Sequence, residues 1–142
     1  MRDIIIVAIG LMIIGFAIAA EGKPTPAVTI RGVTFAVVVA DALDERLRGL
    51  SGREALAEGE GMWFVFDKPG LHAIWMKDMR FSIDVLWLDD TLRVIHIEER
   101  LSPDSYPEVF KPRAPARYVL EVPAGAIEQY SFRTGDLAWF SP

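Results

Sequence analysis

The chain has 142 residues, a formal net charge of −5 and no cysteine. This length fits a single domain. The acidic balance argues against a nucleic-acid partner, because nucleic-acid-binding domains usually carry a basic patch. The absence of thiols excludes cysteine catalysis and thiolate metal sites.

The first twenty residues predict an export signal. Residues 4–20 are all apolar or glycine, and as a helix they would be about 25 Å long, close to the roughly 30 Å hydrocarbon core of a bilayer. A small-x-small pattern at residues 17–19 precedes polar residues, as at a cleavage site. Residues 1–20 therefore predict a signal peptide or an uncleaved membrane anchor. Either places the remainder outside the cytoplasm, as a secreted, periplasmic or outward-facing anchored protein.

A linker and two strands follow. Residues 21–26 are kept extended by two prolines, and the domain spans residues 27–142. Alternating apolar residues predict strand structure over 28–40, with a break at Gly32.

Short helical segments come next. Asp41 is the expected N-cap of a helix over residues 42–48 that ends at Gly49. A second helical piece is predicted over residues 54–57.

The stretch from Gly61 to Asp89 is rich in aromatic residues and forms the centre of the expected fold. Strands over 62–66 and 71–77, joined by a turn at 67–70, predict a hairpin. The strand at 83–88 is apolar on both faces and is therefore expected to be central.

The C-terminal part adds further short strands, at 92–98, 116–122 and 135–140, with a helical turn near Ile127 and a proline-containing loop at 102–115. This spacing predicts a mainly β chain: a single β-sandwich or barrel-like domain with one or two short helices near its start, behind the N-terminal apolar helix.

Five stretches of the chain stand out as an ordered set: residues 46–53, 61–66, 75–79, 83–87 and 118–125. Taken together, they resemble the domain of unknown function 192 family. The resemblance implies a compact, mostly β, sandwich-like domain, often behind a signal peptide, and it implies no activity. One departure is Ser82, where the family commonly has proline.

Asp84 is the most prominent candidate for chemistry. It lies in the predicted central strand, so its carboxylate must be paired, hydrogen-bonded or neutral. It could serve as an acid, a base or a ligand acceptor, or it could pin the fold through Arg, Lys or loop amides. Arg53 is one candidate ion-pair partner, and an Arg53–Asp84 pair would organise a pocket.

The segment around Trp75 supplies the other ligand-binding candidates. Trp75 and Lys77 share one face of the predicted strand, and Asp78 lies on the other. An exposed Trp75 could stack on a sugar or an aromatic ligand; the alternative is core packing. The ligand-binding candidates are thus Trp75, Lys77, Asp78, Asp84 and Arg53.

A catalytic arrangement has weak support. Asp84 with Asp78 or His72 could form a hydrolase-like site, but no nucleophile motif accompanies these residues. No ligand spacing indicates a metal site, and no cofactor is expected.

The sequence thus favours a non-catalytic extracytoplasmic β module that binds a small polar ligand, with a glycan as one example, or a partner protein. The alternatives are the hydrolase-like enzyme and a structural envelope protein. Contact with a membrane is expected only through residues 1–20, if they are not cleaved.

Overall fold

The computed structural model describes residues 22–142. The predicted signal or anchor helix falls within residues 1–21, outside the described part. Among residues 22–142, no helix is both long and apolar enough to cross a membrane.

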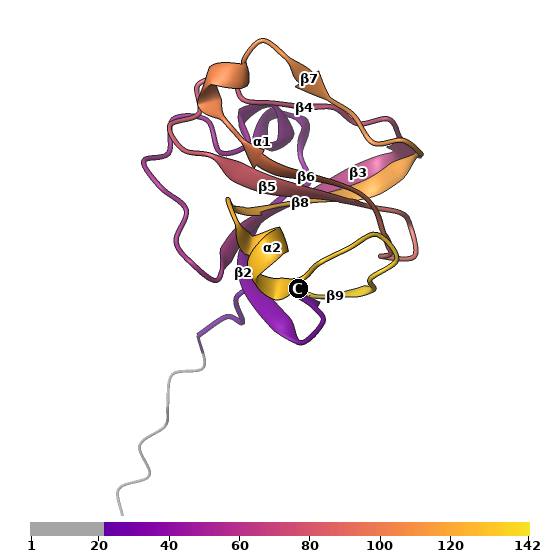
Figure 1. Ribbon diagram of the computed structural model, residues 1–142. Coiled ribbons are helices and arrows are strands. Elements are labelled where there is room, and N and C mark those ends of the chain that lie inside the picture. Colours follow the sequence, from indigo (N-terminus) through magenta and orange to yellow (C-terminus); the bar gives the residue numbers. More distant parts are fainter. Residues whose placement is uncertain (1–21) are drawn as a thin grey trace, which may run out of the picture.

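The described chain is built around one curled sheet of seven strands (Figure 1). Its strands are arranged in the order β6-β5-β8-β3-β2-β1-β9, and a separate two-stranded sheet pairs β4 with β7. The strands are β1 (Ala27–Ile30), β2 (Val33–Ala40), β3 (Glu60–Gly70), β4 (Ile74–Trp75), β5 (Ile83–Leu88), β6 (Val94–Leu101), β7 (Val109–Phe110), β8 (Ala116–Pro123) and β9 (Ala138–Ser141). The helices are α1 (Leu43–Arg48), the 3-10 helix η1 (Pro103–Ser105) and α2 (Ala126–Tyr130).

The sheet curls far enough for its two edges to meet at one end. At the start of β6, Val94 N donates to Asp136 O at 2.8 Å, and a bridge joins Arg93 to Leu137 just before β9. Pairing is antiparallel throughout the sheet except between β2 and β3. The result is a half-barrel.

Two apolar clusters fill the two sides of the sheet. The first includes Trp63, Leu120 and residues of α2; the ring of Trp63 stacks on Tyr118 with 5.0 Å between centroids. The second includes Phe64 and Trp87, and it lies on the side covered by α1, β4 and β7 (Figure 1). Alternation along the strands sends neighbouring residues to opposite clusters.

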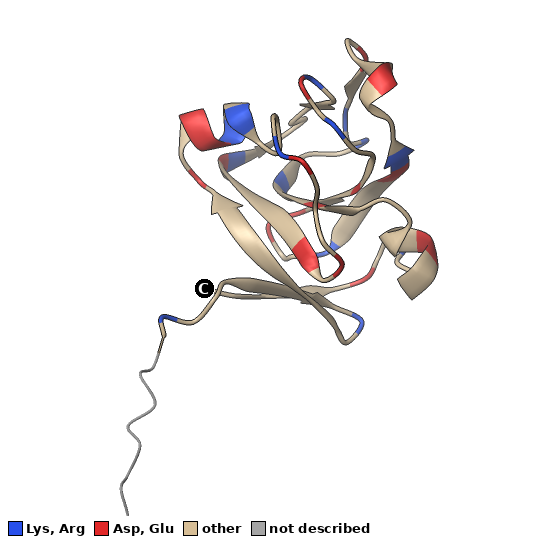
Figure 2. Ribbon diagram, turned by 90° about the vertical axis from the view of Figure 1, so that its left-hand side faces the viewer, with Lys and Arg blue, Asp and Glu red and all other residues tan. Residues whose placement is uncertain are grey.

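Charged residues lie mainly in turns, in helices and at strand ends. Figure 2 shows Lys and Arg interspersed with Asp and Glu, while the long strands are mostly uncharged. Such mixed charge is typical of a soluble surface.

The mainly β prediction is confirmed, with a half-barrel as the architecture. The strand at 83–88 and the helix at 42–48 match β5 and α1. Only α1 lies near the start of the domain, because α2 follows β8.

Other local predictions were wrong. Residues 62–77 do not form a hairpin: β3 continues to Gly70, which pairs with Ala116, and β4 pairs with β7. The segment predicted to be a loop at 102–115 contains the helix η1 and the strand β7. Residues 54–57 contain no helix.

The expected helix cap at Asp41 was also wrong. The cap position is Ala42, and the side chain of Glu45 turns back instead, accepting hydrogen bonds from the backbone amides of Asp41 and Ala42 at 3.2 and 3.1 Å. A carboxylate in the first helical turn satisfies free amides there.

Candidate functional site

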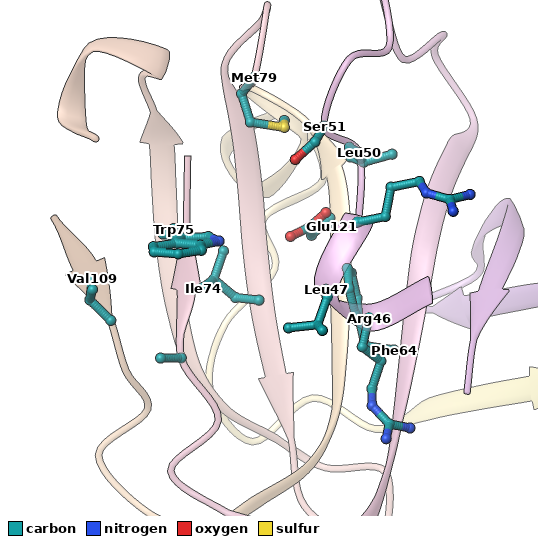
Figure 3. A pocket seen from close by; sticks show the side chains of 13 residues that line it. Arg46, Leu47, Leu50, Ser51, Phe64, Ile74, Trp75, Met79, Val109 and Glu121 are labelled. Atoms are coloured by element: carbon teal, nitrogen blue, oxygen red, sulfur yellow. The ribbon is translucent and has the colours of Figure 1, made fainter. Parts of the chain in front are cut away.

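A cavity of about 340 Å³ lies beneath α1, between the turn that follows it and the β4–β7 pair (Figure 3). This volume is within the range of small-molecule sites. Most of the wall is apolar and comes from Leu47, Leu50, Phe64, Ile74, Met79 and Val109. The polar side chains of the lining are Arg46, Arg48, Ser51 and Glu121, and Gly49, Ala73 and Trp75 complete it.

Two hydrogen bonds hold the walls of this pocket together. Ser51 Oγ donates to Lys77 O at 2.8 Å, and Gly52 N donates to Asp78 O at 2.9 Å. The turn after α1 is thereby fixed to the segment after β4, so the cavity lies between joined parts of the chain.

Glu121 forms the base of the pocket. In β8 it pairs with Met62 of β3 and Val85 of β5, and the residue is only 5% exposed. Its carboxyl group points into the space enclosed by Leu47, Leu50 and Ile74 (Figure 3). Strand alternation places it there, because residues 120 and 122 face the opposite cluster.

Burial controls the protonation of this acid. It raises the pKa of Glu121 from its ordinary value of 4.5 to about 8. None of the described residues donates a hydrogen bond to its carboxyl group or lies close enough as a cation to lower that pKa. At neutral pH Glu121 is therefore mainly a neutral acid that faces an apolar cavity.

The arginines of α1 lie at the edge of the pocket without pairing with this acid. Arg46 Nη1 donates to Val65 O at 2.9 Å and also to Asp41 O, and its guanidinium is 5.5 Å from the centroid of the Phe66 ring. These contacts hold its charge away from Glu121 (Figure 3).

Trp75 forms one lip of the pocket and is 47% exposed. Tyr106 contacts it edge-on with 5.7 Å between ring centroids. Lys77 Nζ lies 5.5 Å from the centroid of the Trp75 ring. Of the ligand-binding residues expected from the sequence, Trp75 is the one that lines this pocket.

Asp84 lies on the other face of the sheet and is fully buried. Its Oδ1 accepts a hydrogen bond from Arg100 N at 2.8 Å, and its Oδ2 accepts from Gly125 N and Ile127 N at 3.0 and 2.8 Å. Both oxygens are thus occupied by backbone amides. The carboxylate joins β5 to the end of β6 and to the start of α2, a structural role.

The pairing of Asp84 with Arg53 is not found. Arg53 is exposed and lines a separate cavity of about 170 Å³ beside Thr25 and Leu56. The partners of Asp84 are amides from distant parts of the chain, and sequence pattern does not reveal such partners.

The catalytic candidates are not assembled around one cavity. His72 stacks on Phe66 with 3.7 Å between ring centroids, and its Nε2 is 2.8 Å from Lys68 O. Asp78 is exposed, at a backbone φ of 56°. Neither lines the pocket that contains Glu121. Residues 22–142 also hold no cluster of three potential metal-binding His, Asp or Glu side chains.

Sequence reasoning missed Glu121. Its place after Arg117 and Val119 on one side of an alternating strand is equally typical of a solvent-facing row. One signal was present: Val119, an apolar residue, lies on the same side of the strand as the acid, and Leu120 and Val122 flank it. Of the five stretches that carry the family resemblance, four contribute to the pocket lining.

Comparison with solved structures supports the fold. A structure from Sinorhizobium meliloti 1021, described as a proposed transcription regulator, is 26% identical, with a TM-score of 0.77 over 84% of this chain and 98% of that one. A protein of unknown function from Novosphingobium aromaticivorans is also 26% identical, with a TM-score of 0.74 over 80% of this chain and 83% of that one.

A search of curated proteins gave no match. The model of the DUF192 family, described as "Uncharacterized ACR", matches residues 26–138, which include all but the last residues of the half-barrel. The chain therefore belongs to the DUF192 family.

Proposed function

We propose that this protein is a non-catalytic binding module whose pocket takes a small ligand with an apolar body and one polar group that contacts Glu121. One observation carries the proposal: a buried acid without a protein partner points into an apolar cavity. Burying an unpaired polar group costs free energy, so a fold that keeps one at the base of a cavity is suited to a ligand that completes its bonding.

The lining favours such a ligand over a glycan. A sugar needs many hydrogen-bonding groups around it, whereas Ser51 and Glu121 are the polar side chains at the inner wall and Ser51 already donates to Lys77 O. The exposed indole of Trp75 supports stacking of a flat or apolar group at the lip.

Two other functions receive less support. A hydrolase using Asp84 would need a carboxylate free to reach substrate, and both of its oxygens are bonded to amides. Regulation of transcription, the role named in the description of the Sinorhizobium structure, would require DNA contact if it were direct, and a net charge of −5 disfavours such contact.

The pocket can be tested with a fragment screen on the full chain, observed by amide and indole NMR. We expect small aromatic fragments to shift the resonances of Trp75, Ile74 and Ser51. The variant Ala73→Phe places a ring at the wall of the cavity and is expected to abolish these shifts while the remaining spectrum is unchanged. Fragments that bind both proteins equally would contradict the proposal.

We also propose a position outside the cytoplasm, which is supported by the composition of residues 1–20. Intact mass of the protein purified from its native host distinguishes the two forms: loss of about twenty residues indicates a cleaved signal peptide, and a full-length mass in the membrane fraction indicates an anchor. A full-length protein in the cytosolic fraction would contradict both.

A further inference from the structure

We propose that the ligand of this pocket is an organic ammonium ion: a protonated amine that pairs with Glu121, attached to an apolar or aromatic body held by the wall. This inference rests on the proposed binding function and names the chemical class of the ligand. It follows from what surrounds the acid.

The elements packed around Glu121 supply no cation to it. On α1, Arg46 is bonded to the carbonyls of Asp41 and Val65. Arg48 lines the pocket edge, and no ion pair between it and Glu121 is found within residues 22–142.

On the neighbouring strands, the side chains next to Glu121 are uncharged, and the charged side chains make contacts elsewhere. Met62 and Val85, the register partners of Glu121, carry no charge. Asp84 is on the opposite face of β5. On β8 itself, Arg117 shares the face of Glu121, but its Nε donates to Phe66 O at 2.5 Å. Among residues 22–142 no cation is paired with Glu121, so the cation of a ligand can take this place.

The rest of the site suits an ammonium ion with an apolar body. Phe64 and Trp75 present aromatic rings to the cavity, and aromatic faces attract cations. Trp75 already holds the ammonium group of Lys77 on one side. The net charge of −5 also raises the local concentration of cations around the molecule.

Binding is then linked to one proton. At neutral pH the free protein carries Glu121 as the neutral acid; when the ammonium ion binds, the carboxyl proton leaves to solvent and the ion pair forms. The ammonium ion keeps all its protons, so charge and atoms balance. The affinity for an amine should therefore rise with pH up to about 8, the pKa of the free acid.

A matched series of probes tests this class: 2-phenylethylammonium, 2-phenylethanol and 3-phenylpropanoate, which share a phenyl body and differ in the polar group. Each is titrated calorimetrically into the full chain at pH 6 and pH 8, in two buffers of different ionisation enthalpy. We expect the ammonium ion to bind about ten- to hundredfold more tightly than the alcohol at pH 8, as a charge-assisted bond does. We also expect it to bind more weakly at pH 6, with release of close to one proton at that pH.

The variant E121Q keeps the shape of the side chain and removes its charge. It is expected to bind the ammonium ion and the alcohol equally and without proton release. If wild type binds the alcohol or the carboxylate at least as well as the ammonium ion, the ammonium proposal is overturned while the pocket stands. If none of the three binds wild type differently from Ala73→Phe, the binding function itself is overturned.

Discussion

Two buried acids in adjacent strands have opposite environments. Asp84 and Glu121 lie one position apart in the register of β5 and β8, because Val85 pairs with Glu121 and Asp84 pairs with Val122. They consequently face opposite sides of the sheet. Asp84 is surrounded by three amide donors, whereas Glu121 faces a cavity. Both acids are buried, so the presence or absence of hydrogen-bond donors is what distinguishes the structural Asp84 from the candidate functional Glu121.

Replacing Asp84 should destabilise the fold strongly. Asp84→Ala leaves three amides, those of Arg100, Gly125 and Ile127, without their acceptor, and each unsatisfied buried group costs about 1–3 kcal/mol. We expect the free energy of unfolding to fall by about 3 kcal/mol or more, measured by urea denaturation.

The matched control is Asp90→Ala, at an exposed turn, with an expected change within about 0.5 kcal/mol. In a double-mutant cycle, Arg53→Ala and Asp84→Ala should be additive within about 0.5 kcal/mol. A loss of less than about 1 kcal/mol in Asp84→Ala would contradict the structural role.

The sequence predicted part of this residue-level picture. An acid in a strand that is apolar on both faces had to be buried, and Asp84 is. Its partners come from residues 100, 125 and 127, and only the tertiary fold brings them together. Glu121 escaped notice because alternation of apolar and polar residues along residues 116–122 is compatible with a half-exposed strand.

At the scale of elements, β3 connects the pocket to the rest of the sheet, because it lies between β2 and β8. At Gly61 this strand approaches β8 closely. A Cβ added there would lie 2.9 Å from the carbonyl oxygen of Glu121 and 3.3 Å from Leu120 Cδ1. The absence of a side chain at this position lets the backbones approach beneath the candidate site.

Gly61→Ala should therefore strain the β3–β8 pairing. We expect a loss of about 1–3 kcal/mol in unfolding free energy, typical of overpacking, together with shifts of the amide resonances around Glu121. Gly22→Ala is the control: no atom lies within 4 Å of its added Cβ, so little change is expected. Equal stability of the two variants would show that β3 and β8 do not approach so closely.

The sequence pattern correctly predicted the elements that can be recognised without knowing which strands they pair with. The strand at 83–88 is apolar throughout, and the helix at 42–48 ends at Gly49, whose φ is 51°. The hairpin at 62–77 failed because Asp67-Lys68-Pro69-Gly70 looks like a tight turn, while the actual partners of these segments are β8 and β7, far along the chain.

For the whole molecule, the protonation of Glu121 links stability to pH. Its pKa is about 8 when folded, above the ordinary 4.5. The stabilisation from holding this proton is fully present below pH 4.5 and is lost as pH rises through 8. Between these values the folded state binds one more proton than the unfolded state, so unfolding free energy falls by about 1.4 kcal/mol per pH unit.

The variant E121Q has no carboxyl group at position 121 and therefore lacks this titration. Other groups titrate alike in both proteins, so their effects cancel in the difference. We expect E121Q to gain stability relative to wild type by about 1.4 kcal/mol per pH unit between pH 5 and 8, measured by urea denaturation at each pH. A constant difference across this range would contradict a neutral buried Glu121.

The most direct test is a carbon-13 NMR titration of the glutamate side-chain carboxyl groups of the full chain, with Glu121 assigned by its absence in E121Q. We predict a midpoint near pH 8 for Glu121 in the free protein and a lower midpoint with saturating 2-phenylethylammonium. A midpoint near the ordinary value of 4.5 in the free protein would contradict the account, because Glu121 would then be a solvated carboxylate and not a buried acid awaiting a ligand.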